Sequence, residues 1–274
     1  MAIIAIGQQI GTHAVELGNL IARELSYRFI GGPELTAIAV ERYGVTPEQL
    51  LVFDERQPHF WERVRTDNEL MLAILRAVIL KEIVSDQVVV AGRILVPMIL
   101  PHDVPNGVRI RTVGPLAARN KQVAIEESLD PAAAERRVRD SDRELRARLQ
   151  SLMGTELDDA SYYHFIVNTY AKPRETIARA IAEFARDLDR QLDAAARAAL
   201  RDEATTAQVR AAFLLHPKIG RAAIDIRSSG GIVRLSGAGL LPPWDDLVRK
   251  VAASAAGVSR VEIQVEEAPI PPQP

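Results

Sequence analysis

The chain has 274 residues, which is longer than a typical single domain, so two domains are expected before any pattern is considered. Hydrophobic residues make up 47% and charged residues 26%, a balance that can bury a sizeable core. The 34 basic and 36 acidic residues give a formal net charge of −2, which excludes a global field that would draw the chain to nucleic acid or anionic lipid. The lack of cysteine excludes disulfides, thiolate zinc sites and thiol nucleophiles.

The apolar stretches are too short for export or membrane insertion. The first residues are apolar only briefly and lack the basic region of a secretory signal. The longest apolar run, residues 70–83, is interrupted by Arg76 and Lys81 and is shorter than the roughly 20 residues that a membrane span needs. A cytoplasmic location is therefore expected.

Strands and helices alternate along most of the chain. A β-branched run at 2–6 predicts the first strand, and a helical pattern follows at 14–25. The elements expected next are a strand at 26–30, helices at 33–43 and 60–84, strands at 87–91 (ended by Gly92) and 108–113, a helix from 130 to about 153, a strand at 164–167 and a helix from 173 towards 200. This order predicts an α/β domain with a parallel five-stranded sheet and helices on both faces.

Ligands of such sheets bind beyond the carboxyl ends of the strands. The candidate site is therefore expected among the loops that follow Ile6, Ile30, Ala91, Val113 and Val167.

The loop at 7–13, between the first strand and the first helix, has the position of a phosphate-binding loop. Gly7 and Gly11 allow successive backbone N–H groups to converge on an anion at a helix N-terminus. A working Walker loop also supplies a lysine and a Ser or Thr, and here Ala14 and Val15 occupy those places. A plain structural turn is an equally good interpretation of this pattern.

Residues 4–28 contain Gly-Gln-Gln-Ile-Gly-Thr-His-Ala-Val-Glu-Leu-Gly followed by Ile-Ala-Arg-Glu-Leu-Ser-Tyr-Arg-Phe, which resembles the opening of the cytidylate kinase-like family. The resemblance continues through residues 88–93, 114–119, 142–144, 158–159 and 167–169 and covers roughly residues 1–185. It implies a P-loop kinase-like domain that uses ATP with Mg²⁺ to phosphorylate a nucleoside monophosphate such as CMP. No catalytic residue and no protein ligand of a metal is assigned.

The loop departs from the Gly-Ser-Gly-Gly type that the family carries. The second and third glycines of the family loop correspond to His13 and Ala14, the early arginine to Gln8, and the basic residue after the loop to Val15. The loop is therefore a degenerate form of the family's loop. The resemblance still implies that its nucleotide phosphates lie near Gly7, Gly11, Thr12 and His13.

Arginines supply the other candidate contacts. The resemblance implies that Arg93, after the third strand, contacts the monophosphate, and that Arg119, at the start of the helix after the fourth strand, faces bound nucleotide. Arg143 and Arg146 lie in the region that corresponds to the lid, where arginines neutralise charge on the transferred phosphoryl group.

The arginines of the helix from 130 also have a simpler explanation. Arg136, Arg139, Arg143 and Arg146 share one face, because they recur at spacings of three and four residues. Acids four residues earlier, as in Glu135–Arg139, Asp142–Arg146 and Glu144–Arg148, are typical of an ordinary solvated helix.

The C-terminal part has a different order of elements. A helix is expected at 206–215, strands at 222–227 and 232–235 around a Ser-Ser-Gly-Gly turn, a helix at 243–256 and a strand at 260–265. The runs Gly-Ile-Val-Arg-Leu-Ser-Gly at 231–237 and Gly-Val-Ser-Arg-Val at 257–261 resemble a BON domain. The resemblance implies a small α+β domain without catalytic residues that binds lipids, small ligands or proteins.

The predicted domains are a cytidylate kinase-like domain at 1–198, a BON-like domain at 204–267 and a disordered tail at 268–274. Two functions stay open: a nucleotide-binding protein, active as a kinase or not, and a non-catalytic sensor or interaction protein that acts through its BON-like end. The expected partners are a nucleotide or another small anion, and a protein or lipid at the BON-like domain, but no nucleic acid. Homodimer formation is left open.

Overall fold

The computed structural model describes residues 2–46, 65–84, 87–93, 107–153, 159–190, 194–220, 222–237, 240 and 243–265. The tail predicted at 268–274 lies outside these residues. The chain divides into two compact units: the first comprises Met1–Arg65 and Ser85–Asp193, and the second comprises Thr66–Val84 and Ala194–Pro274. Across the described ranges, no helix has the length and apolar character needed to cross a membrane.

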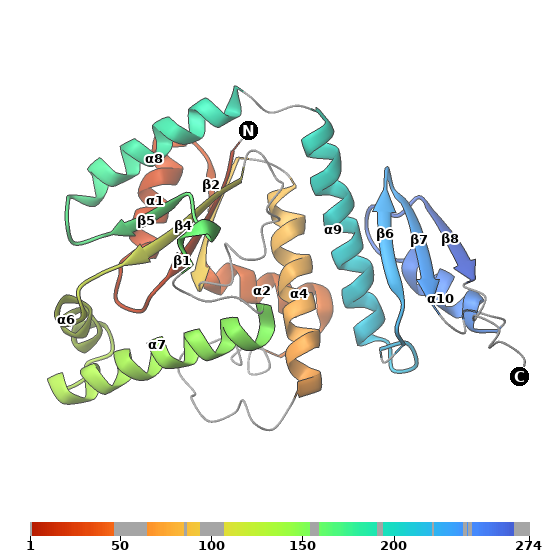
Figure 1. The fold of residues 1–274 in the computed structure, drawn as a ribbon, viewed down its shortest axis with the longest axis horizontal. Coiled ribbons are helices and arrows are strands. Elements are labelled where there is room, and N and C mark those ends of the chain that lie inside the picture. The colour runs from red at the N-terminus through yellow and green to blue at the C-terminus, as the bar shows by residue number, and fades with distance from the viewer. Residues whose placement is uncertain are drawn as a thin grey trace, which may run out of the picture. The chain divides into compact units, whose positions relative to one another are not determined.

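The first unit is built on a parallel five-stranded sheet (Figure 1). Its strands are β1 (Ile3–Gln8), β2 (Arg28–Ile30), β3 (Val88–Arg93), β4 (Gly107–Val113) and β5 (Phe165–Asn168). They lie in the order β2-β3-β1-β4-β5, and each neighbouring pair is parallel. The predicted parallel five-stranded sheet is confirmed.

The helices of the first unit are α1 (Ala14–Leu25), α2 (Gly32–Tyr43), α6 (Leu116–Glu126), α7 (Pro131–Met153) and α8 (Arg174–Asp189), with a 3₁₀ helix η2 (Ala160–Tyr162). The bounds predicted for α1 are confirmed. Two other expectations were wrong. Gly92 does not end β3, because Gly7 pairs with Gly92 and Gln8 with Arg93, and ladder hydrogen bonds need no side chain. The helix expected to run from 173 towards 200 ends at Asp189.

Both faces of the sheet are covered. On one face, α1 and α8 supply apolar side chains that pack on the strands; this core includes Ile4, Ile6, Leu17, Ile21, Val89, Ile110 and Ile181. On the opposite face, Ile3, Ala5, Val88 and Val90 are also buried. Burial on both faces explains why β1 and β3 are apolar at successive positions rather than at alternate ones.

The parallel register brings the carboxyl ends of β1, β3 and β4 to one edge. Gln8 at the end of β1 is paired with Arg93 on one side and Thr112 on the other. The loops that follow β1, β3, β4 and β5 therefore start at the same edge, where the candidate site was expected.

The second unit holds a three-stranded sheet in the order β6-β7-β8, with an antiparallel β6–β7 hairpin and a parallel β7–β8 pair. Its elements are α4 (Arg65–Ile83, which enters this unit at Thr66), α9 (Ala194–Leu215), β6 (Asp225–Ser229), β7 (Ile232–Gly237), α10 (Trp244–Ala253) and β8 (Arg260–Val265). The helix expected to begin at 206 begins at Ala194, because the alanine-rich stretch before it has high helix propensity.

Candidate functional site

The loop between β1 and α1 presents the start of a helix. Gly11 and His13 both have left-handed backbone conformations, with φ of 72° and 52°. His13 is the N-cap of α1, and its side chain makes no capping hydrogen bond. The first N–H groups of a helix lack intrahelical acceptors, so this end of α1 can donate to an anion.

The Thr12 side chain points into the protein. It is 1% exposed, and its hydroxyl donates to the Gln9 carbonyl at 2.6 Å and lies 2.7 Å from the Thr112 hydroxyl. Thr112, in β4, is fully buried. The Thr12 hydroxyl therefore closes the loop onto the sheet.

Gly11 is packed tightly against α6. A Cβ atom at this position would lie 2.9 Å from the backbone oxygen of Arg119 and 3.2 Å from a Val123 methyl carbon. Its carbonyl accepts a hydrogen bond of 2.5 Å from the Tyr170 hydroxyl. The loop is thus held by α6 and by the segment after β5.

Tyr170 covers the β4–α6 turn as well as the loop. A Cβ atom at Gly114 would lie 2.7 Å from the Tyr170 ring, and the His13 ring lies 5.5 Å from it between centroids. Burial raises the pKa of Tyr170 above its ordinary value, and the nearby Glu126 carboxylate raises the pKa further, while the cationic Arg119 and Arg174 oppose the shift.

The predicted phosphate-binding His13 is largely covered. Its side chain is 16% exposed, and its Nδ1 lies 3.6 Å from the Glu16 carboxylate. Glu16 also forms a 2.9 Å ion pair with Arg174. The two carboxylate oxygens of Glu16 therefore face one basic side chain each.

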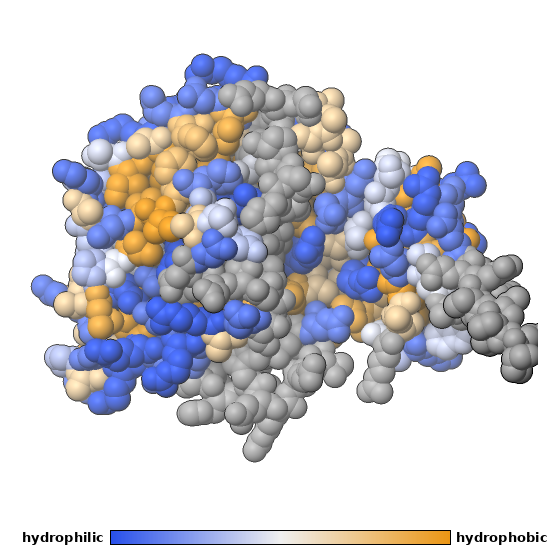
Figure 2. All heavy atoms as spheres, in the orientation of Figure 1, coloured by the Kyte–Doolittle hydropathy of each residue, from blue (hydrophilic) through white to orange (hydrophobic). Residues whose placement is uncertain are grey.

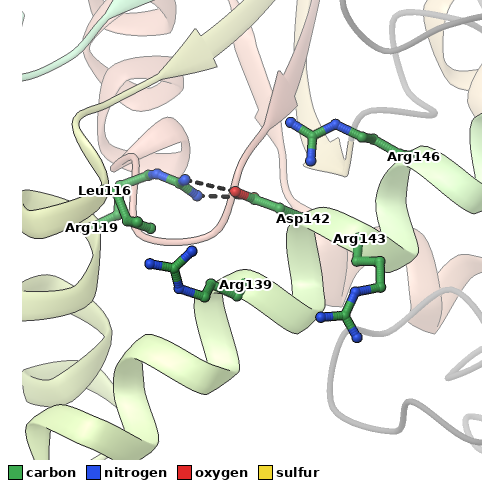
Figure 3. A pocket seen from close by; sticks show the side chains of 6 residues that line it. All are labelled: Leu116, Arg119, Arg139, Asp142, Arg143 and Arg146. Carbon is green, nitrogen blue, oxygen red and sulfur yellow. Dashed lines mark hydrogen bonds and ion pairs between the residues drawn. The ribbon is translucent and has the colours of Figure 1, made fainter.

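A hollow of about 330 Å³ opens between α6 and α7, and we call it the arginine hollow (Figure 3). It is lined by Leu116, Arg119, Arg139, Asp142, Arg143 and Arg146. The structure thus brings together three of the predicted site residues, Arg119, Arg143 and Arg146. The loop adjoins the hollow, because the backbone of Arg119 packs on Gly11.

Arg119 forms the wall of the hollow through a bidentate ion pair. Its two terminal nitrogens donate to the Asp142 carboxylate at 3.0 and 2.7 Å, and its Nε donates to the Gly114 carbonyl at 3.2 Å. The side chains of Arg119 and Asp142 are only 5% and 14% exposed. Arg119 therefore has a structural task within the predicted site.

The other arginines of the hollow are more exposed. Arg139 pairs with Glu135, as its spacing predicted, and Arg143 lies 3.4 Å from Asp140. Figure 3 shows the Arg139 guanidinium on the side of Arg119, whereas Arg143 points away from the Arg119–Asp142 pair. Figure 2 shows hydrophilic residues gathered along α7. With four arginines and one aspartate, the lining has a formal charge of +4 − 1 = +3.

The remaining predicted residues lie at the sheet edge. Gly7 is in β1, between Gly92 and Arg111, and its carbonyl accepts from Thr112 at 3.4 Å. Arg93 is the last residue of β3, and its side chain lies outside what the structure describes. Within the described ranges, no group of three or more His, Cys, Asp or Glu side chains is placed to hold a metal ion.

Two residues that help to form the candidate site were not predicted from the sequence. Tyr170 lies two residues after the end of the fifth strand at Asn168, so its place at the carboxyl edge was a usable signal. Asp142 was interpreted as the helical partner of Arg146, and only the approach of α6 to α7 makes it the partner of Arg119. The predicted Glu144–Arg148 pair involves the Arg148 side chain, which lies outside the described residues.

A sequence model of the cytidylate kinase-like family matches residues 3–171, more than half of the chain. An uncharacterized protein from Eubacterium ventriosum has a similar structure, with a TM-score of 0.53, 16% identity, and coverage of 68% of this chain and 98% of that one. Shikimate kinase from Bacteroides thetaiotaomicron aligns with a TM-score of 0.43, 15% identity and coverage of 68% and 98%. A gluconokinase from Sinorhizobium meliloti aligns with a TM-score of 0.39, 17% identity and coverage of 70% and 97%. No curated protein matches the sequence.

Proposed function

Because the chain belongs to the cytidylate kinase-like family, we propose that its first unit binds a nucleotide, with the phosphate groups in the arginine hollow. The observation that carries the proposal is the lining of the hollow, to which α6 and α7 contribute four arginines and one aspartate. The β1–α1 loop, which adjoins the hollow, lies at the carboxyl edge of the sheet. Ligands of this fold class bind at that edge.

Charge and size both suit a phosphate ester. Arginine presents a planar fork of N–H donors that matches phosphate oxygens, and such charge-assisted hydrogen bonds are stronger than neutral ones. The volume of about 330 Å³ lies at the lower end of the range for small-molecule sites. A nucleoside monophosphate such as CMP is therefore our first candidate ligand.

The loop is less suited to ATP with Mg²⁺. In P-loop enzymes a lysine reaches the β/γ-phosphates and a Ser or Thr hydroxyl binds Mg²⁺. Here Ala14 and Val15 carry neither group, and the Thr12 hydroxyl is occupied by Gln9 and Thr112. We therefore propose nucleotide binding as the function and treat phosphoryl transfer from ATP to CMP as an activity to be tested.

Thermal unfolding of the full chain with CMP, CDP, ADP or ATP tests this proposal. A ligand at 100 times its Kd stabilises the folded state by about 2.7 kcal/mol, which is readily measured as a rise in Tm. We expect CMP to raise the Tm. If none of the four nucleotides does so, the proposal fails. ADP production from ATP in the presence of CMP measures transfer separately.

Two variants locate the binding site. We expect Arg139→Gln to weaken CMP binding roughly tenfold, the equivalent of about 1.4 kcal/mol, because it removes one guanidinium from the hollow. Arg136→Gln is the matched control, since Arg136 is an exposed arginine of the same helix that does not line the hollow. Equal effects of both changes would place the ligand elsewhere.

A second function is favoured by the C-terminal unit. We propose that residues 204–267 form a BON-like domain through which the chain meets a lipid, a protein or another copy of itself. The alternation in β7 supports it, because Val233 and Leu235 are fully buried while Arg234 is exposed. Co-sedimentation of the full chain with anionic phospholipid vesicles tests lipid binding, and light scattering tests the homodimer. Cell fractionation tests the cytoplasmic location.

A further inference from the structure

The charged side chains in the five-stranded sheet are all basic. The described strands contain Arg28, Arg93, Arg109 and Arg111, with no aspartate or glutamate. In P-loop enzymes a strand-end aspartate and the loop hydroxyl together hold Mg²⁺ on the phosphates. The described strands therefore supply no carboxylate at the carboxyl edge, where β1, β3 and β4 end in Gln8, Arg93 and Val113.

Two described side chains that could offer oxygen atoms at the loop, Thr12 and Glu16, already have partners. The Thr12 hydroxyl contacts the Gln9 carbonyl and the Thr112 hydroxyl at 2.6 and 2.7 Å. The Glu16 carboxylate, in the first turn of α1, is 2.9 Å from Arg174. To bind Mg²⁺, either side chain would have to give up these contacts.

The Asp142 carboxylate, which lines the hollow, also has a partner already. Asp142 accepts two hydrogen bonds from Arg119, and both side chains are mostly buried. Mg²⁺ needs near-octahedral oxygen ligation from carboxylates, phosphates and water. Among the residues that the structure describes, the hollow is rich in guanidinium groups, and Asp142 in the hollow and Glu16 at the loop are both paired to arginine. These described donors do not fit that ion.

We propose that the site takes its nucleotide as a metal-free anion, with arginine side chains supplying the charge compensation that Mg²⁺ supplies in a kinase. This inference rests on the proposed nucleotide binding. It has a direct consequence for ATP: the free anion carries more negative charge than the Mg²⁺ complex, so the free anion binds more tightly to a hollow of formal charge +3.

Isothermal titration of the full chain with ATP and with CMP, in EDTA and in excess Mg²⁺ at equal ionic strength, tests the inference. We expect ATP to bind in EDTA and Mg²⁺ to weaken that binding roughly tenfold, because the complex has lost two negative charges. CMP binding is expected to change little, since a single phosphate holds Mg²⁺ weakly.

The possible results separate the inference from the proposal beneath it. ATP binding that requires Mg²⁺, or is tighter with it, overturns the metal-free site and leaves nucleotide binding intact. If neither ATP nor CMP binds in either buffer, the metal-free inference and the proposed nucleotide binding are both overturned. Arg143→Gln adds a second check, because Arg143 is 79% exposed and we expect its replacement to leave the fold undisturbed. It should weaken ATP binding more in EDTA than in Mg²⁺, whereas Arg136→Gln should change neither.

Discussion

Arg119 holds Asp142 in a two-pronged ion pair that joins helix α6 to helix α7, with N–O distances of 3.0 and 2.7 Å. The pair forms a wall of the arginine hollow, and it lies beside the loop through the contact of Arg119 with Gly11. We therefore expect both the stability of the first unit and the proposed ligand binding to depend on these two side chains.

Loss of the Asp142 carboxylate should be costly. Asp142→Ala leaves the Arg119 guanidinium buried without its counter-charge, and we expect a loss of about 3–5 kcal/mol in the free energy of unfolding. Asp140→Ala is a matched control on the same helix, because its ion pair with Arg143 is exposed and is expected to contribute at most about 1 kcal/mol. Urea unfolding followed by circular dichroism measures both. Similar losses for the two variants would contradict a structural role for the Arg119–Asp142 pair.

Two glycines with similar backbone angles should respond differently to alanine. Gly11 and Gly44 have φ of +72° and +65°, but a Cβ atom at Gly44 meets open space, whereas at Gly11 it meets the Arg119 carbonyl at 2.9 Å. We expect Gly44→Ala to cost about 1–2 kcal/mol, the usual strain of a left-handed residue. Gly11→Ala should cost more, because α6 must also shift. The unfolding midpoints of the two variants measure these losses of stability. A smaller loss for Gly11→Ala than for Gly44→Ala would show that the loop is not packed on α6.

The inward hydroxyl of Thr12 should be worth more to stability than to ligand binding. Thr12→Val keeps the shape but leaves the Gln9 carbonyl and the Thr112 hydroxyl without this partner, so we expect a loss of about 1–3 kcal/mol. Thr12→Ser should restore most of it, because the hydroxyl is retained. Denaturant titration of the three proteins is the measurement. A Thr12→Val protein as stable as the parent, yet unable to bind nucleotide, would mean that the hydroxyl faces the ligand instead.

Tyr170 should make the protein sensitive to alkali. Its raised pKa means that the folded state keeps the phenolic proton at a pH where the unfolded chain has begun to lose it, near the ordinary tyrosine value of about 10. The unfolded state then binds fewer protons, so the free energy of unfolding falls as the pH rises through this region.

Tyr170→Phe removes this titration and the hydrogen bond to the Gly11 carbonyl. We expect the variant to be less stable by about 1 kcal/mol near neutral pH and to lose stability less steeply above pH about 10. Burial also raises the pKa of Tyr43, so part of the loss of stability at high pH is expected to remain in both proteins. Unfolding midpoints across this pH range provide the test; parallel curves for parent and variant would rule out Tyr170 as the source.

Local patterns were enough to predict most elements of the first unit. The apolar runs at β1 and β3, and the helical spacing of α1, depend on side chains close together in the sequence, so the alternation of strands and helices and the parallel sheet followed from them. The edge at which the loops gather also followed, because parallel strands end on the same side. Element ends were less well predicted. Strand β3 continues past Gly92 because ladder hydrogen bonds need no side chain, and helix α9 begins as early as Ala194 because the alanine-rich stretch has high helix propensity.

The sequence by itself therefore determined the sheet, the position of the loop and the row of arginines on α7. Only the tertiary structure decided what these residues do, because their partners are far away along the chain. Asp142 lies four residues before Arg146, yet it pairs with Arg119, since the packing of α6 on α7 brings the buried guanidinium within 2.7 Å. In the same way, the Thr12 hydroxyl lies 2.7 Å from the Thr112 hydroxyl, which only the pairing of β1 with β4 brings near.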